Sequence, residues 1–228
     1  FHKGQTKRLL KKGIATMFID HFTARDQLGS TAGNQFTVNI WSQFLDPFIA
    51  LEYIHGADLS AVRMHRSNNL ITWAELEPWV FQLCDALSMA HSEQIVHRDL
   101  KPTNMMIDER GRLKLADFGI AATMADALNR VTVQPDGSGT LMYMSPQQLQ
   151  GGAPCATDDI YALGATLYEL LTSRAPFFSG DINHQVQNVP PQPVQACQKE
   201  LGIENPIPPN VASLIMACLS KNTAERPP

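Results

Sequence analysis

The chain has 228 residues, of which 44% are hydrophobic and 18% are charged, and its formal net charge is -4. This composition is ordinary for one or two globular domains with a sizeable core, and it excludes a disordered or fibrous chain. The basic residues before Asp46 outnumber the acidic ones by six to two, but few aromatic residues interleave with them. We therefore interpret this end as a solvated basic surface, and we do not expect nucleic acid as a partner.

The four cysteines, Cys84, Cys155, Cys197 and Cys218, lie far apart in the sequence and form no Cys-x-x-Cys pair. This spacing disfavours both a disulfide framework and a zinc site. No apolar run approaches the roughly 18 residues that span a bilayer, and the chain does not open with a signal peptide. We expect a reduced, cytoplasmic domain without a membrane segment, and an anchor outside these residues is compatible with it.

The first elements predicted in chain order are two strand-like runs at 38–44 and 48–54, separated by the turn-forming pair Asp46-Pro47. Asp58 follows the second run. Its side chain is suited to cap a short helix that begins at Leu59.

Three further helices are predicted. Thr72 and Glu75 form a capping box in front of apolar residues at helical spacing, which predicts a long amphipathic helix to about His91. The run 159–171 is apolar enough for a buried, central helix. Asn210 is suited to cap a last helix. The apolar face of that helix is expected to contain Val211, Leu214, Ile215, Cys218 and Leu219.

Residues 105–108 and 113–116 are predicted to form a β-hairpin around the turn 109–112. A hairpin brings its two ends side by side. Asn104 and Asp117, which flank these strands, are therefore predicted to converge although they lie 13 residues apart.

The most specific stretch runs from His97 to Asn104 and reads His-Arg-Asp-Leu-Lys-Pro-Thr-Asn. It concentrates an acid, bases and an amide in one loop, and each such group needs a partner where it is buried. Together with Asp117-Phe118-Gly119, this stretch resembles the catalytic loop and the metal-binding motif of protein kinases. Further stretches that resemble this family are 139–147 at the end of the activation segment, 159–164 at the start of the central helix, and 221–227.

The resemblance covers about 38–228 and implies an α+β, protein-kinase-like fold. It implies a mostly helical C-terminal lobe at 59–228 that ends before the last helix. A hinge is implied at 52–58, and a truncated or diverged β-rich N-terminal lobe at 1–51.

Two structural contacts are also implied by the resemblance. In protein kinases the aspartate at the position of Asp159 holds the backbone of the catalytic loop. Gln147 stands where these proteins usually have a glutamate that pairs with the arginine at position 226. We expect a hydrogen bond between Gln147 and Arg226 that is weaker than the ion pair, so that Gln147→Glu would be stabilising.

The function implied is transfer of the ATP γ-phosphate to Ser or Thr hydroxyls of a protein substrate, with ATP and Mg2+ as cofactors. An aspartate of pKa about 3.9 is a weak base, so Asp99 would align the hydroxyl and accept its proton late, and Lys101 would reach the γ-phosphate. Mg2+ selects hard oxygen ligands of the kind that an amide and a carboxylate offer. The catalytic residues implied are Asp99, Lys101, Asn104 and Thr140. The nucleotide-binding residues implied are Leu51, Glu52, Ile54, Asp58, Met106 and Asp117, and the metal ligands are Asn104 and Asp117.

Alternative functions follow from the N-terminal part, which departs from the family because neither a Gly-x-Gly motif nor a glutamate precedes Glu52. A pseudokinase that binds nucleotide or acts as a scaffold is the main alternative. A small-molecule phosphotransferase of kinase-like fold is a third, but it would lack the Gly-Thr-x-x-Tyr segment. Lys101-Pro102 favours the Ser/Thr branch, and the stretches 143–148 and 159–164 resemble its bacterial, eukaryotic-like subset.

Overall fold

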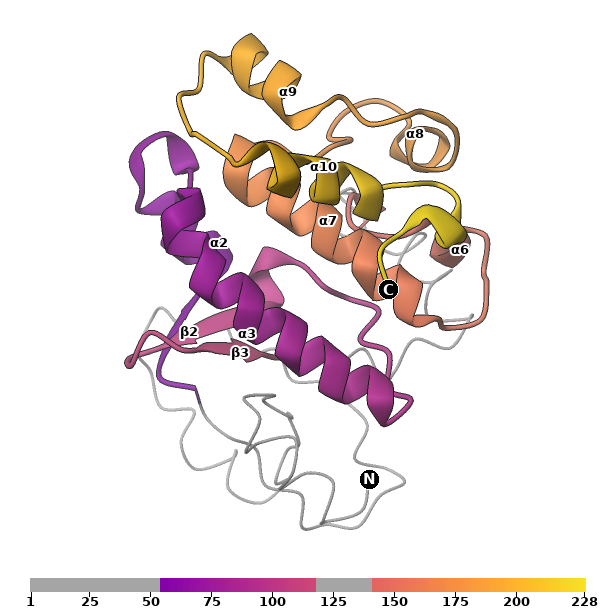
Figure 1. The fold of residues 1–228 in the computed structure, drawn as a ribbon, viewed down its shortest axis with the longest axis horizontal. Helices are drawn as coiled ribbons and strands as arrows, with labels where there is room; N and C mark the ends of the chain where they lie inside the picture. The colour runs from indigo at the N-terminus through magenta and orange to yellow at the C-terminus, as the bar shows by residue number, and fades with distance from the viewer. Residues whose placement is uncertain (1–53, 118–140) are drawn as a thin grey trace, which may run out of the picture.

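The computed structural model describes residues 54–117 and 141–228, which form a helix-rich body with a small antiparallel sheet (Figure 1). This architecture agrees with the predicted α+β class. The strands predicted at 38–44 and 48–54 lie outside the described residues, apart from Ile54. Within these two ranges, no helix combines the length and the apolar character that crossing a membrane requires.

Three helices carry most of the core: α3 (Trp73–Ser92), α7 (Ala156–Thr172) and α10 (Pro209–Cys218). The central element is α7, because it contacts both α3 and α10 and is buried along most of its length. In Figure 1, α10 lies alongside α7, and α3 runs below them in nearly the same direction as α7 in this view. The predicted buried helix at 159–171 is thus confirmed, with three more residues at its start and one at its end.

The start of α3 confirms the predicted capping box. Thr72 Oγ1 accepts a hydrogen bond from the Glu75 N–H at 3.3 Å, and the Glu75 carboxylate accepts one from the Thr72 N–H at 3.2 Å. These two bonds satisfy backbone donors that the first helical turn leaves without partners. The helix therefore begins at Trp73, where the sequence predicts it.

The last helix differs from the prediction. It begins at Pro209 instead of after Asn210, because proline is favoured in a first helical turn, where its missing N–H costs nothing. The sequence pattern places Leu214 on the buried face, but this side chain is 53% exposed. Ile215, Cys218 and Leu219 are buried as predicted, and Ala212 is buried in place of Leu214.

Shorter helical segments connect these elements in the described residues. They are α2 (Leu59–Met64), α6 (Pro146–Leu149), α8 (Ile182–Asn188) and α9 (Val194–Leu201), with 3-10 turns at Ser67–Asn69, Pro102–Asn104 and Thr223–Glu225. As predicted, α2 starts at Leu59, and Asp58 Oδ1 accepts the Ala61 N–H at 2.8 Å. The sequence did not indicate α6, α8 or α9, because segments of at most eight residues show little helical periodicity.

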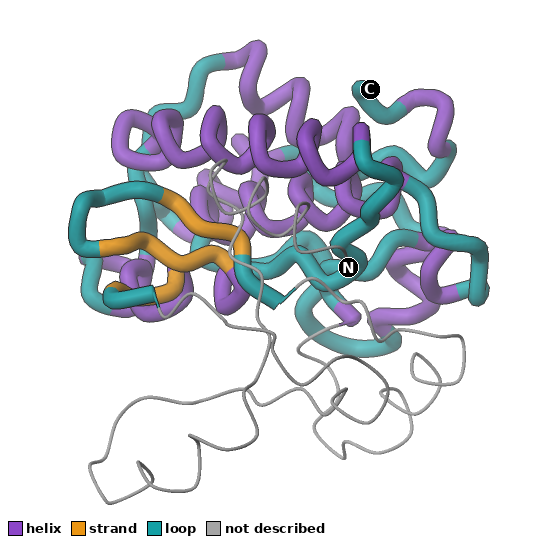
Figure 2. The backbone as a smooth tube through the Cα atoms, turned by 90° about the horizontal axis from the view of Figure 1, so that it is seen from below, coloured by secondary structure: helices purple, strands orange, loops and turns teal. Residues whose placement is uncertain are grey.

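The sheet has the order β1-β2-β3, and both strand pairs are antiparallel (Figure 2). The strands are β1 (Gly56–Asp58), β2 (Met105–Asp108) and β3 (Leu113–Leu115). The predicted hairpin is confirmed as β2 and β3, and beyond it the Ala116 N–H donates to the Asn104 carbonyl at 2.8 Å. Only glycine fits at position 56, because a Cβ there would lie 1.9 Å from the carbonyl oxygen of Ile107.

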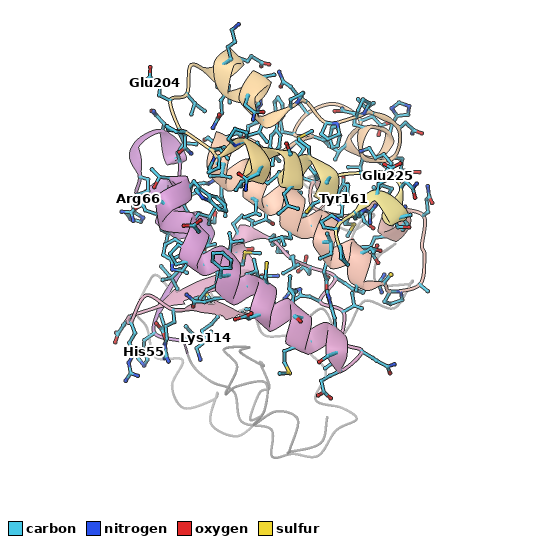
Figure 3. The ribbon with its side chains drawn as sticks, in the orientation of Figure 1. His55, Arg66, Lys114, Tyr161, Glu204 and Glu225 are labelled. Carbon is cyan, nitrogen blue, oxygen red and sulfur yellow. The ribbon has the colours of Figure 1, made fainter. Side chains whose placement is uncertain are left out.

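The core is formed mainly by side chains of α3, α7 and α10. Tyr161 lies between the helices, whereas Arg66 lies at the periphery (Figure 3). The approach of α10 to α7 depends on Gly164, since a Cβ at this position would lie 2.6 Å from the Cβ of Cys218. A side chain at position 164 would force the two helices apart.

The buried side-chain amides of Asn205 and Gln198 link the start of α3, the end of α7 and the loop after α9. Asn205 Nδ2 donates to the carbonyls of Ile71 and Leu171, at 3.1 Å each. Gln198 Nε2 donates to the Asn205 carbonyl at 2.8 Å and to the Leu171 carbonyl at 3.3 Å. Both side chains are at most 9% exposed, so these bonds satisfy backbone groups that water cannot reach.

The predicted contact between Gln147 and Arg226 is present. Arg226 Nη2 donates to Gln147 Oε1 at 2.7 Å, and Gln147 Nε2 donates to the Lys221 carbonyl at 2.9 Å. The second bond changes the expected effect of Gln147→Glu. A carboxylate would bind Arg226 more strongly but would lose the donor to Lys221, so we no longer expect that substitution to be stabilising.

Removing both bonds is expected to destabilise the fold. Gln147→Met should lower the free energy of unfolding by about 2 kcal/mol, at about 1 kcal/mol for each hydrogen bond of typical strength. Chemical denaturation followed by circular dichroism measures this change. As a control, Gln150→Met alters an exposed side chain directly after α6, the helix that contains Gln147. It should change the free energy of unfolding by less than about 0.5 kcal/mol. Equal effects of the two variants would contradict the role given to Gln147.

Candidate functional site

The loop 95–104 between α3 and β2 is held by one buried carboxylate. Asp159, which is 0% exposed, accepts the backbone N–H groups of His97 and Arg98, each at 2.8 Å. Its Oδ2 also lies 2.8 Å from His91 Nε2 of α3. The expectation that Asp159 holds the backbone of this loop is therefore confirmed, and the charge of the carboxylate is matched by donors.

The ring of His97 orders the same loop from the inside. It is 0% exposed, its Nε2 donates to the Ala116 carbonyl at 2.9 Å, and its Nδ1 accepts the Asp99 N–H at 3.2 Å. This pattern requires a neutral ring with the proton on Nε2. Burial lowers the pKa of His97 and outweighs the nearby Asp159, so the neutral form is the one that suits the fold.

Asp99, Lys101 and Asn104 form one polar cluster. Lys101 Nζ lies 3.1 Å from Asp99 Oδ1 and 2.9 Å from Oδ2. Asn104 Nδ2 donates to Asp99 Oδ2 at 3.0 Å and to the Asp99 backbone carbonyl at 2.7 Å. The Asp99 carboxylate is thus fixed from two sides, which leaves little freedom in its orientation.

Asp117 lies at the other end of the hairpin, next to this cluster. Its backbone has a φ of 51°, in the left-handed region that Asp and Asn tolerate better than most residues. No side chain or backbone group among the described residues donates a hydrogen bond to its carboxylate. Burial raises the pKa of Asp117, the charge of Asp99 raises it further, and Lys101 opposes the shift.

The side-chain oxygens of Asn104 and Asp117 fit a hard divalent cation. Asn104 uses its amide nitrogen for both hydrogen bonds to Asp99, which leaves its Oδ1 to coordinate an ion. Burial and the charge of Asp99 both disfavour the ionised Asp117 carboxylate, and a cation would offset them. Amide and carboxylate oxygens are the ligands that Mg2+ takes together with water and phosphate.

The predicted nucleotide-binding residues are brought together in part. Asp58 and Met106 face each other across the β1–β2 pair. Met106 is half-buried, whereas the neighbouring Met105 is fully buried in the core, as expected for alternate residues of a strand. Ile54 lies two residues before the first residue of β1. The remaining predicted site residues, Leu51, Glu52 and Thr140, lie outside the described residues.

A second polar cluster, which the sequence did not indicate, anchors the segment after residue 140. The Tyr143 hydroxyl donates to the Glu169 carboxylate of α7, and Arg63 Nη1 of α2 lies 2.8 Å from Glu169 Oε1. Burial raises the pKa of Tyr143, and the Glu169 charge adds to this effect. An acid within the apolar run of α7 was the available signal, because a glutamate is rarely buried without a partner.

Comparisons with known proteins agree with this arrangement. Residues 37–228 match a family model described as Protein kinase domain. The chain is 35% identical over 182 residues to serine/threonine-protein kinase PknB of Mycolicibacterium smegmatis, and 34% identical over 182 residues to PknB of Mycobacterium tuberculosis. Each alignment covers 79% of this chain but 28% of the relative. The chain therefore spans less than a third of the length of these relatives.

Solved structures with a similar fold include two mutants of the PknI kinase domain of Mycobacterium tuberculosis. Their TM-scores are 0.56 and 0.54, at 24% and 22% sequence identity. Each similarity covers 77% of this chain and 58% of the solved chain. At this identity the likeness establishes the kinase-like fold alone.

The raised pKa of Asp117 predicts a stabilising substitution. The folded chain binds the Asp117 proton more tightly than the unfolded chain does, so ionisation of this group opposes folding. Asp117→Asn should therefore raise the thermal midpoint at pH 7, and this gain should vanish below about pH 3.9, where the unfolded group is protonated too. Differential scanning fluorimetry across this pH range measures both effects.

The same variant tests the cation site without an activity assay. Mg2+ with ADP should raise the midpoint of the wild-type chain more than that of Asp117→Asn. Asp85→Asn, which neutralises an exposed carboxylate on α3, should behave like the wild type in both measurements. A lower midpoint for Asp117→Asn at pH 7 would show that its carboxylate stabilises the fold.

Acid should destabilise the fold through His97. Its pKa is lowered in the folded chain, so the unfolded chain binds a proton first as the pH falls below about 6.5. His97→Gln should reduce the dependence of unfolding free energy on pH between about pH 7.5 and 5.5 by up to about 1.4 kcal/mol per pH unit. Urea titrations at several pH values measure this slope, and His184→Gln, at an exposed position, should leave it unchanged.

Proposed function

Because this chain belongs to the protein kinase family, we propose that it transfers the γ-phosphoryl group of ATP to Ser or Thr hydroxyls of a protein substrate. One observation carries the proposal: Asp99, Lys101, Asn104 and Asp117 meet at the ends of a single hairpin. Transfer of a phosphoryl group needs positioned charges more than covalent help from the protein, and these four side chains supply them.

Asp99 would act on the incoming hydroxyl. Its carboxylate would accept a hydrogen bond from the substrate O–H, point the oxygen at the γ-phosphorus and take up the proton as the new P–O bond forms and the bond to ADP breaks. The contacts from Lys101 and Asn104 keep this carboxylate oriented. Orientation of the two reactants accounts for much of the rate enhancement that such a site can supply.

Lys101 would contribute positive charge close to the transferred group. Its Nζ lies within 3.1 Å of both Asp99 oxygens, so it would lie close to the substrate hydroxyl that Asp99 aligns. Asn104 and Asp117 would hold Mg2+ through their side-chain oxygens. They would hold it where its positive charge would offset the negative charge of the ATP phosphates.

The adenine and ribose would bind on the side of β1. We propose that Leu51 is the gatekeeper, that Glu52 and Ile54 offer backbone groups to the adenine, and that Met106 forms the apolar floor beneath it. Asp58 would contact the ribose. Its Oδ1 accepts the hydrogen bond that caps α2, so its Oδ2 would make the contact with the ribose. Thr140, from the Gly-Thr-x-x-Tyr segment, completes the proposed catalytic set.

The Ser/Thr specificity rests on Lys101-Pro102 and on the relatives, which are named as serine/threonine-protein kinases. We also propose a division into an N-terminal lobe remnant at 1–51, a hinge at 52–58 and a C-terminal lobe at 59–228. A cytoplasmic site of action is proposed with it, since ATP is available there.

A substitution at Asp99 tests the function. Asp99→Asn keeps an oxygen that can accept from Asn104 but removes the charge and the proton acceptor. Phosphoryl transfer from radiolabelled ATP to a generic Ser/Thr protein substrate should fall by about 100-fold or more, the usual contribution of a general base. Asp85→Asn, at an exposed position of α3 that makes no hydrogen bond to the cluster among the described residues, should keep the wild-type rate.

The alternatives are separated by the same assay. Equal transfer by the wild-type chain and Asp99→Asn would overturn the proposed role of Asp99. Binding of ATP without any transfer by the wild-type chain would instead favour the pseudokinase function.

A further inference from the structure

Arg98 has an unusual backbone conformation directly before Asp99. Its φ is 66°, in the left-handed region that residues other than glycine, asparagine and aspartate rarely adopt. Such a conformation persists only where its surroundings hold it in place. What fixes Arg98 therefore also fixes the direction in which the chain enters Asp99.

The peptide unit between Arg98 and Asp99 is held at both of its polar atoms. Its N–H, which belongs to Asp99, donates to His97 Nδ1 at 3.2 Å. Its carbonyl oxygen, which belongs to Arg98, accepts from Gln148 Nε2 at 3.0 Å. Because the peptide unit is planar, these two bonds together set the orientation of the plane from which the Asp99 side chain projects.

Gln148 is itself firmly anchored. It is 7% exposed, its Oε1 accepts the Ser145 N–H at 3.0 Å, and its own N–H donates to Ser145 Oγ at 3.0 Å. These two bonds form the capping box at the start of α6. Ser145 Oγ in turn donates to Asp158 Oδ1 at 2.5 Å. Two adjacent acids of α7 thus support the loop, Asp159 directly and Asp158 through the α6 cap.

We propose that Gln148 is a positioning residue for Asp99, which couples the segment 141–149 to the catalytic loop. Its amide nitrogen makes a bond to the loop that no spacing in the sequence reveals, since Gln148 and Arg98 are 50 residues apart. A displacement of α6 would release the Arg98 carbonyl and loosen the peptide plane before Asp99. The consequence for turnover rests on the proposed kinase function, whereas the consequence for loop order does not.

Gln148→Glu separates the two roles of this side chain. A glutamate keeps the oxygen that accepts the Ser145 N–H, and it is a preferred residue at this position of a capping box. It lacks the N–H that binds the Arg98 carbonyl. Gln150→Glu is the matched control, because it introduces the same charge two residues away on an exposed side chain.

Hydrogen–deuterium exchange of the chain tests the proposal without activity. Gln148→Glu should speed exchange of the amides at 97–99 roughly tenfold, the change expected when one hydrogen bond of typical strength is lost. The amides at 145–148 and all amides of Gln150→Glu should keep wild-type rates. Gln148→Met, which introduces no charge, should speed exchange in both stretches.

Wild-type exchange at 97–99 in Gln148→Glu would overturn the proposal, and so would wild-type exchange there in Gln148→Met if the glutamate variant does not fold. With kinase turnover measurable, Gln148→Glu should lower kcat roughly tenfold at unchanged KM for ATP, because the loop and not the nucleotide site is disturbed. Equal losses in kcat and affinity would indicate a general structural defect and contradict the assignment. Absence of turnover in the wild-type chain would refute the proposed function while leaving the exchange result decisive.

Discussion

The described part of the chain depends on a carboxylate that is entirely removed from water. An isolated buried carboxylate would cost several kcal/mol, but Asp159 is surrounded by the N–H groups of His97 and Arg98 and by the ring of His91. The helix that carries it is buried along most of its length. The ten-residue loop 95–104 is too short to fix its own conformation, and its hydrogen bonds to Asp159 of the central helix fix it instead. Loss of any one donor would leave part of the charge unmatched, so the buried carboxylate would then destabilise the fold that it now stabilises.

This dependence explains how a short loop can present several charges in fixed positions. Asp159 accepts the backbone N–H groups directly before Asp99, the neutral ring of His97 accepts the Asp99 N–H, and Gln148 donates to the Arg98 carbonyl. The β2–β3 hairpin then returns the chain so that Asp117 comes to lie beside Asp99. The loop and the hairpin thus hold the carboxylates of Asp99 and Asp117 close together although their charges repel one another. Burial, with the charge of Asp99 added to it, raises the pKa of Asp117, and a bound cation would offset both effects.

Much of this arrangement could be predicted from sequence, and the exceptions have physical reasons. The Thr72 cap, the hairpin and the burial of α7 follow from local spacing, because each depends on residues close together in the chain. The convergence of Asn104 and Asp117 follows from the hairpin alone. By contrast, the bond from Gln148 to Arg98 and the cluster around Glu169 join residues far apart, and neither leaves a periodic signal. Leu214 was misplaced because periodicity reports that a helix has an apolar stripe but not how wide the partner surface is.

The buried amides of Asn205 and Gln198 carry a consequence for the way the chain reaches this structure. The carbonyl that precedes α3, on Ile71, and the carbonyl at the end of α7, on Leu171, both accept from Asn205. During synthesis the Ile71 carbonyl is made long before its donor, because Asn205 follows it by 134 residues in the chain. Contacts of such separation slow folding, because a large loop must close before they form. A nascent chain therefore completes this core only after residues 194–218 have emerged, and until then it exposes the apolar face of α7 that α9 and α10 later cover.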